Sequence, residues 1–283
     1  MKNLKVTGYI NKTTGEYFDA ESIIEVTNSV ETKKIFRSIQ NSNDYINKNL
    51  GYYFHLLYED ILKLDLKPQM LIRFLKLCSY ANYKNVLVTG ETKGQRTIQE
   101  KELENILNLK DKEARSTKKY LLENNLISIE KDLIKVDIRF IRRGKLKGDI
   151  KDMDITRVFN RGIQELYDNV KPTQHKKLVT FIKILPYINI KYNIICDNPL
   201  ETDIEKIRPI TWTELGRRIG LSEIMTKRLK SELWKLKINN SVCVGEFSTF
   251  LCGKSIVVNP VIYYKGNNIE NLKGIMNLFK LNK

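Results

Sequence analysis

The chain has 283 residues, 42% of them hydrophobic, so it is long enough for two domains of ordinary size and too apolar for wholesale disorder. No apolar run reaches the roughly 18–20 residues of a membrane span, and MKNLKVTGYI at the N-terminus lacks the apolar segment of a secretory signal, so we expect a soluble, cytoplasmic protein with no membrane partner. Lysine and arginine total 49 against 33 acidic residues, a net charge of +16 that favours a polyanionic partner, nucleic acid before an anionic membrane surface.

The first 50 residues predict an N-terminal arm. VTGYINKTTGEYF (6–18) is typical of a hairpin with a Thr-Gly turn, and VETKKIFRSIQN (30–41) of a short basic helix. We interpret this arm as serving either oligomerisation or additional nucleic-acid contact.

Two blocks of the remaining sequence occur twice. RFLKLCSYANYKN (73–85) is similar to TFIKILPYINIKY (180–192), and ELENILNLKDKEARSTKKYLLENNLI (102–127) to ELGRRIGLSEIMTKRLKSELWKLKIN (214–239). Because both blocks recur in the same order, we infer two copies of one module. This repeat divides the chain into five segments: the arm at 1–50, a first copy at 51–145, a charged linker at 146–156, a second copy at 157–268 and a C-terminal helical tail at 269–283.

Both copies predict the same order of elements: helix, strand, helix, turn, helix and hairpin. The elements expected in the first copy are helices at 68–81, 99–107 and 111–124, an extended stretch at 85–89, and a hairpin at 126–141 around a Lys-Asp turn. Those expected in the second copy are helices at 175–190, bent or ended at Pro186, then at 213–219 and 222–236, and strands at 242–247 and 255–259. This order predicts an α+β, mainly helical fold with two winged helix-turn-helix domains in tandem.

The turn before the last helix of each copy has the chemistry of a helix-turn-helix. Gly220 can adopt the left-handed conformation that such a turn needs, and Asn108, at the same place in the first copy, is the next-best residue. Ser222 is the expected N-cap of the helix that follows. Helical spacing places these residues on the inward faces: Ala114, Thr117 and Leu121 in the first copy, and Met225, Leu229, Leu233 and Leu236 in the second.

The opposite faces of these helices are basic, and we predict that they contact DNA. Arginine or lysine on an exposed helix can reach guanine edges in the major groove, and serine can reach either base. The candidates are Lys112, Arg115, Ser116 and Lys119 in the first copy, and Arg217, Arg218, Lys227, Arg228, Lys230 and Ser231 in the second. The alternatives are a solvated basic helix face, which is common, and a lysine-rich composition that reflects only an AT-rich genome.

A further basic stretch, RFIRRGKLKGDIK (139–151), follows the first hairpin. Arginines on such an arm can enter a narrow, A·T-rich minor groove, where the negative potential is deepest. The candidate residues here are Arg139, Arg142, Arg143, Lys145 and Lys147. A charged interdomain linker is the alternative, and we expect a linker that also contacts phosphate.

Sites for catalysis, metals and cofactors are not predicted. CGKS (252–255) is similar to the end of a phosphate-binding loop, but Ser248 stands where that loop needs glycine and a strand follows, so we interpret it as a hairpin turn that leaves Lys254 available for phosphate. The four cysteines and two histidines lack the spacing of a zinc site or a disulfide framework. We expect buried free thiols, no cofactor, no metal and no enzyme activity.

The two repeated blocks and the closing segment SIVVNPVIYYKGN (255–267) resemble the tandem winged-helix replication initiators of plasmids and phages of Gram-positive bacteria. The resemblance covers about residues 52–267. It implies that one winged helix serves dimerisation and the other binds origin repeats, with a second copy of the chain and host replication proteins as further partners. The leucine-rich dimer motif of these initiators is not evident here.

We therefore predict a non-enzymatic, sequence-specific protein that binds double-stranded, A·T-rich DNA, in its narrowest form a plasmid or phage replication initiator. A transcription regulator or partition adaptor with the same DNA chemistry is the second hypothesis, and a DNA-processing enzyme is the third. RNA is a poorer partner, because the deep, narrow major groove of A-form duplexes does not admit a helix.

Overall fold

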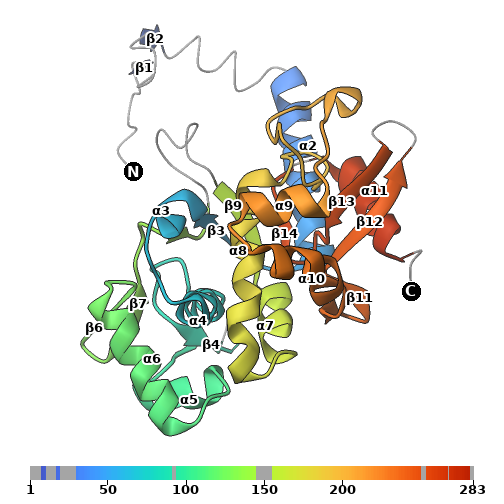
Figure 1. Cartoon of the computed structure of the whole chain (residues 1–283). Helices are drawn as coiled ribbons and strands as arrows, with labels where there is room; N and C mark the ends of the chain where they lie inside the picture. The colour runs from blue at the N-terminus through green and yellow to red at the C-terminus, as the bar shows by residue number, and fades with distance from the viewer. Residues whose placement is uncertain are drawn as a thin grey trace. The chain divides into compact units, whose positions relative to one another are not determined.

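The computed structural model describes residues 8–10, 17–19, 30–90, 94–144, 155–249, 253–266 and 268–280. The chain divides into two compact units, residues 1–49 and 50–283. Helices and small antiparallel sheets make up the described residues, which confirms the predicted α+β class (Figure 1). None of the helices among these residues is long and apolar enough to span a membrane.

The first unit contains a hairpin and a helix. Strands β1 (Gly8–Ile10) and β2 (Tyr17–Asp19) pair antiparallel, as expected, with Ile10 opposite Tyr17, and the turn between them lies outside the described residues. Helix α2 (Val30–Leu50) is longer than the expected helix at 30–41. No glycine or proline interrupts it before Gly51, whose left-handed φ of +82° is typical of the residue that follows a helix.

The second unit is built around a four-stranded antiparallel sheet that the sequence analysis did not predict. Its strands are β3 (Tyr53–Leu57), β8 (Ile141–Arg142), β9 (Ile155–Phe159) and β14 (Tyr263–Tyr264), in the order β14-β9-β3-β8. Each copy contributes one central strand and one edge strand. The central strand pairs with the edge strand in the same register in both copies. Leu56 lies opposite Ile141 in the first copy, and Val158 lies opposite Tyr263 in the second. Strand β9 also crosses the predicted boundary between linker and second copy.

The remaining elements of the first copy follow the expected order. They are α3 (Tyr58–Leu62), α4 (Pro68–Cys78), β4 (Val88–Thr89), β5 (Arg96–Thr97), the 3-10 helix η1 (Glu100–Glu102), α5 (Leu103–Ile106), α6 (Asp111–Glu123), β6 (Ile127–Glu130) and β7 (Leu133–Val136). Pro68 opens α4, as expected. The β6–β7 hairpin turns at Lys131 and Asp132, both with positive φ, which confirms the Lys-Asp turn.

The second copy continues after β9 with helices and a longer hairpin. Its elements are α7 (Asn160–Asp168), η3 (Pro172–Val179), α8 (Thr180–Lys183), η4 (Leu185–Tyr187), η5 (Ile204–Lys206), α9 (Trp212–Arg218), α10 (Glu223–Trp234), β10 (Lys237–Ile238), β11 (Ser241–Val242), β12 (Val244–Thr249) and β13 (Gly253–Val258). The helix expected at 175–190, bent or ended at Pro186, is found as a run of short helical segments from η3 to η4 that ends at Tyr187. Pro186, which lacks an N–H and clashes with the preceding turn, lies in the last of them.

Helix α11 (Ile269–Lys280) forms the expected helical tail and packs on the second copy. The Phe279 and Phe247 rings meet edge-on with their centroids 5.1 Å apart. The Ser241 hydroxyl also donates a hydrogen bond to the Phe279 carbonyl.

The two copies share a set of local contacts around a matched asparagine. The side-chain oxygens of Asn82 and Asn189 each accept two backbone N–H groups from the residues that follow. The next extended stretch then pairs with the returning hairpin strand, so that the Leu87 N–H donates to β7 (2.9 Å) and the Ile195 N–H to β13 (2.8 Å). The same sequence pattern therefore folds in the same way in both copies.

Helix α4 lies at the joint between the copies, where it contacts α6, α7 and η3 (Figure 1). Its position explains why even Arg73 and Lys76 are only 2% exposed. Arg73 donates to the Thr117 hydroxyl (2.9 Å) and pairs with Glu113, which ties α4 to α6.

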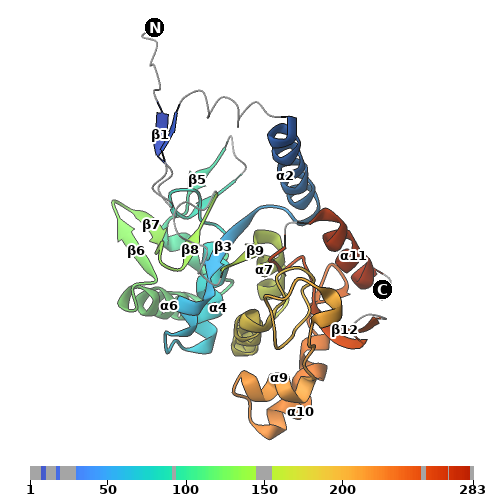
Figure 2. The same cartoon turned by 90° about the horizontal axis from the view of Figure 1, so that it is seen from above.

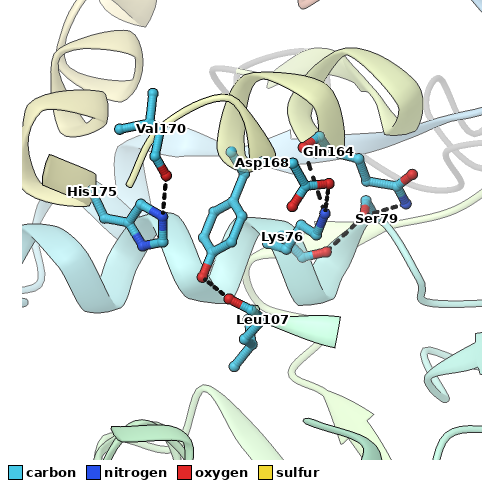
Figure 3. A network of polar contacts seen from close by, with 8 residues as sticks. Lys76, Ser79, Leu107, Gln164, Asp168, Val170 and His175 are labelled. Carbon is cyan, nitrogen blue, oxygen red and sulfur yellow. Dashed lines mark hydrogen bonds and ion pairs between the residues drawn. The ribbon is translucent and has the colours of Figure 1, made fainter. Parts of the chain in front are cut away.

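A polar network joins α4 to α7 (Figure 3). The Lys76 ammonium pairs with the Asp168 carboxylate at 2.6 Å and lies 5.2 Å from the centre of the Tyr167 ring. The Tyr167 hydroxyl donates to the Leu107 carbonyl (2.8 Å), and the Gln164 amide donates to the Ser79 hydroxyl (2.8 Å). Because buried polar groups must be paired, this network fixes one arrangement of the two copies.

Candidate nucleic-acid interface

The turn between α9 and α10 has the predicted chemistry. Gly220 has φ +74° and Asn108 has φ +48°, so both occupy the left-handed region. The Ser222 hydroxyl accepts a hydrogen bond from the Met225 N–H, which confirms the N-cap. A second glycine was missed: a Cβ on Gly216 would lie 2.5 Å from the Thr226 side chain, so Gly216 is what allows α9 and α10 to pack closely.

The buried faces of α6 and α10 agree with helical spacing except at one position. Ala114, Thr117 and Leu121 are buried on α6, as predicted, as are Leu229 and Leu233 on α10, and Leu236 is half-buried just beyond it. The inward placement of Met225 was wrong, because its side chain is 57% exposed. Thr226 takes the inward position instead, since only a small side chain fits against Gly216.

In the second copy, Lys230 of α10 and Lys254 of β13 converge on one carboxylate. Glu246 of β12 pairs with Lys254 at 2.7 Å and with Lys230 at 3.1 Å, and it also accepts a hydrogen bond from the Trp212 indole N–H. Lys230 lies 4.5 Å from the centre of the Trp234 ring. The structure thus brings together two of the predicted DNA-contacting residues, from α10 and from the β12–β13 hairpin.

The Glu246 carboxyl group is held ionised by these neighbours. Partial burial alone would raise its pKa, but hydrogen bonds from Lys254, Trp212 and Lys230 outweigh this effect and lower the pKa to about 2. At neutral pH the site therefore contains one fixed negative charge between two lysines, leaving a net positive charge.

The other predicted residues of the second copy differ in how they are paired. Lys227 forms an exposed pair with Glu223 at 2.7 Å, and Ser231 donates to the Arg228 carbonyl. Arg217 and Arg228 are exposed, and no carboxylate partner is found for either among the described residues. Arg218 pairs with Asp197 and Glu214, so its charge is already compensated.

In the first copy most predicted cations are neutralised locally. Arg115 pairs with Asp111 and Lys119 with Glu123, in both cases along the exposed face of α6. Lys112 and Ser116 are exposed on the same helix. Within the described residues, Lys112 is the one predicted cation of α6 with no ion-pair partner.

Charge distinguishes the segment of α9 and α10 from its counterpart in the first copy more clearly than exposure does. The segment 212–237, which contains α9 and α10, has seven basic and three acidic residues, a net charge of +4. The matching segment 100–125 has six basic and six acidic residues and is neutral. Net charge therefore attracts a polyanion to the segment of α9 and α10 more than to its counterpart in the first copy.

The predicted DNA-contacting residues of the basic stretch 139–151 do not form one surface. Arg139 pairs with Asp137 at 2.8 Å on the surface, and Arg142 belongs to edge strand β8. Arg143 donates to the Ser79 carbonyl at 3.0 Å. Lys145 and Lys147 lie outside the described residues, together with most of the predicted linker.

Helices α6 and α10 lie apart, with α4 and α7 between them (Figure 2). The predicted residues therefore form two separate surfaces. We name the surface of Lys227, Arg228, Lys230, Trp234 and Lys254 the α10 face.

Sequence analysis missed Glu246 and Trp212, because a glutamate in a strand and a tryptophan at the start of a helix belong to no recognisable sequence motif. Only the fold brings the two side chains together.

Three of the four cysteines, Cys78, Cys196 and Cys243, are buried free thiols as expected, and Cys252 lies outside the described residues. No group of three or more metal-binding side chains is found among the residues that the structure describes. Comparison with protein families, curated proteins and solved structures finds no match for this chain.

Proposed function

We propose that each copy is a winged helix-turn-helix and that the chain binds double-stranded DNA chiefly through the α10 face. In this proposal α10 enters the major groove and the β12–β13 hairpin acts as the wing that contacts the backbone. The observation that carries it is the contrast in charge: α9 and α10 follow a tight glycine turn with a net +4, whereas their counterparts in the first copy are neutral.

The exposed side chains of α10 support the same conclusion. Among the described residues the large apolar side chains most exposed to solvent are Tyr52, Leu64, Tyr83, Ile138, Leu200, Ile224, Met225 and Trp234. Three of these eight belong to the twelve-residue helix α10, which has basic residues between them. Bases offer apolar contacts as well as hydrogen bonds, notably the thymine methyl group, so such a mixed surface suits a groove.

The ion pairs on the α10 face do not oppose this proposal. An exposed pair such as Lys227–Glu223 contributes only about 0.3–0.5 kcal/mol. A phosphate that replaces the carboxylate keeps the lysine paired and releases condensed counterions, which is the main source of DNA affinity. The lysines of the α10 face therefore remain available to phosphate groups although each is paired with a carboxylate in the free protein.

Two matched triple variants test the proposal. The first carries Lys227→Ala, Arg228→Ala and Lys254→Ala, and the second carries Lys112→Ala, Arg115→Ala and Lys119→Ala. Both lose three exposed cations, so the total charge of the protein changes equally. We expect the first variant to bind a 30-base-pair duplex about 100-fold more weakly, and the second less than about fivefold, by fluorescence anisotropy. Equal losses, or no duplex affinity in the native chain, would refute the proposal.

The narrower role that the resemblance implies is replication initiation, in which the chain binds origin repeats and acts by assembly without catalysis. Selection of bound fragments from the source replicon, followed by footprinting, tests this role. Direct repeats beside an origin are the expected result. A single promoter palindrome would instead support the second candidate, a transcription regulator with the same DNA chemistry.

A further inference from the structure

A cavity of about 850 Å³ opens at the joint between the two copies, away from the α10 face. Its walls come from both copies: the loop after α4 and the end of the first copy on one side, and the start of α7 on the other. The lining residues that matter here are Tyr52, Tyr80, Tyr83, Arg143, Asn160 and Gln164. The volume is that of sites that hold a small organic ligand or cofactor.

Arg143 places a positive charge at this cavity, and among the described residues no carboxylate pairs with it. Its guanidinium donates to the Ser79 carbonyl, and its Nε is buried without a partner among the described residues. Burial lowers its pKa, and the groups that favour its charged form are the Tyr83 hydroxyl and the Cys78 thiol, neither of them a carboxylate. Since a buried, uncompensated charge is costly, an anion is the expected counterpart.

The remaining wall has the groups that recognise a flat, polar ring. Tyr83 is 79% exposed and Tyr52 is 69% exposed, so two aromatic faces are available at the mouth. Gly144 keeps the Tyr83 ring close, because a Cβ there would meet that ring at 3.1 Å. Within the part of the chain that the structure describes, the buried side-chain oxygen of Asn160 has no hydrogen-bond partner, which leaves one acceptor for a donor on the ligand.

We propose that this cavity binds a nucleotide. Arg143 contacts the phosphate, a tyrosine ring stacks on the base, and Asn160 accepts a hydrogen bond from the ligand. Two sources share this chemistry: a free nucleotide, and an unpaired nucleotide of a DNA strand held next to the duplex. The site does not depend on the proposed duplex contact, because none of its residues belongs to the α10 face.

The cavity is connected to the network that joins the two copies. Ser79 and Gln164 line it and are hydrogen-bonded to each other, and the Gln164 carbonyl accepts from Lys76 at 3.5 Å (Figure 3). A nucleotide in the cavity therefore contacts residues of both copies at their joint.

Equilibrium dialysis of the full chain with ATP, thymidine 5′-monophosphate and an eight-residue oligothymidylate tests the proposal. Thymidine and ribose 5-phosphate serve as probes that lack the phosphate or the base. We expect saturable binding of at least one of the three nucleotide probes below about 1 mM, and binding at least about tenfold weaker for both incomplete probes. Tight binding of ATP or the monophosphate indicates a free nucleotide, whereas preference for the oligomer indicates a single strand.

Arg143→Met and Tyr83→Ala should each weaken binding by about tenfold or more. Arg139→Met removes a nearby surface arginine that does not line the cavity, so it controls for the general attraction of anions to a basic protein. Tyr83 is largely exposed, so its variant remains informative if Arg143→Met does not fold. No saturable binding, or equal effects of Arg143→Met and Arg139→Met with none from Tyr83→Ala, would overturn the proposal. Loss of duplex binding in the α10-face variant, with nucleotide binding kept, would separate the two sites.

Discussion

At the scale of single residues, Glu246 determines how much of the positive charge on the α10 face is available. Its carboxylate pairs with two of the lysines, one on the helix and one on the hairpin, so it competes with a phosphate for both. Sequence inspection predicted Lys230 and Lys254 as contacts but gave no reason to connect them. Their common partner is apparent only when β12 lies next to α10.

Glu246→Gln removes this competitor with almost no change of shape. We expect duplex affinity to rise by about three- to tenfold at moderate salt, because both lysines then meet the DNA without an opposing charge. Anisotropy titration of native and variant chains on the same duplex measures the change. Glu270→Gln, on α11 and paired with Lys273, is a matched control that should bind as the native chain does. A weaker Glu246→Gln complex would show that the carboxylate positions the lysines productively.

At the scale of elements, the close packing of α9 against α10 depends on Gly216 more than on the turn glycine. A methyl group at Gly216 would overlap the Thr226 side chain, whereas the space around Gly220 is open. We expect Gly216→Ala to lower the free energy of unfolding by about 2–3 kcal/mol and Gly220→Ala by about 1 kcal/mol, the latter from backbone strain alone. Urea unfolding of both variants gives the comparison. Adding Thr226→Ser to Gly216→Ala should recover part of the loss, and its failure to do so would locate the clash elsewhere.

Local sequence patterns correctly predicted those features of the elements that depend on only a few neighbouring residues. Pro68, the Lys-Asp turn, Gly220 with Asn108, and the Ser222 cap act within a few residues, and all four were found as expected. The central sheet was missed because it pairs β3 with β9, about a hundred residues away, and no short-range pattern encodes that partner. Met225 was wrongly assigned to the buried face of α10. The next residue, Thr226, occupies that face because its small side chain fits against Gly216 of α9.

At the scale of the whole molecule, the joint between the copies should make stability depend on pH. His175 lies at this joint, where its Nε2 is 3.1 Å from the Val170 carbonyl (Figure 3). Burial, together with the nearby Arg73 charge, lowers its pKa to about 4. Between pH 6.5 and 4 the unfolded chain therefore binds a proton that the folded chain does not, so stability falls as the pH falls through this window.

From this single histidine we expect a loss of about 2 kcal/mol in the free energy of unfolding between pH 7.5 and 5. His175→Phe should show a pH dependence smaller by that amount in urea unfolding, while keeping the ring contact with Tyr167. His55, whose pKa burial also lowers to about 4, remains in the variant and accounts for part of the residual dependence. An unchanged pH profile would mean that folding does not lower the pKa of His175.

The account as a whole depends on duplex DNA binding by charge, and the salt dependence of the native chain tests this most directly. The measurement is affinity for a 30-base-pair duplex at salt concentrations between about 50 and 200 mM. If roughly 6–10 phosphates are contacted, affinity should fall about 10³–10⁵-fold over this range. An affinity that stays flat across the range would contradict the proposed function.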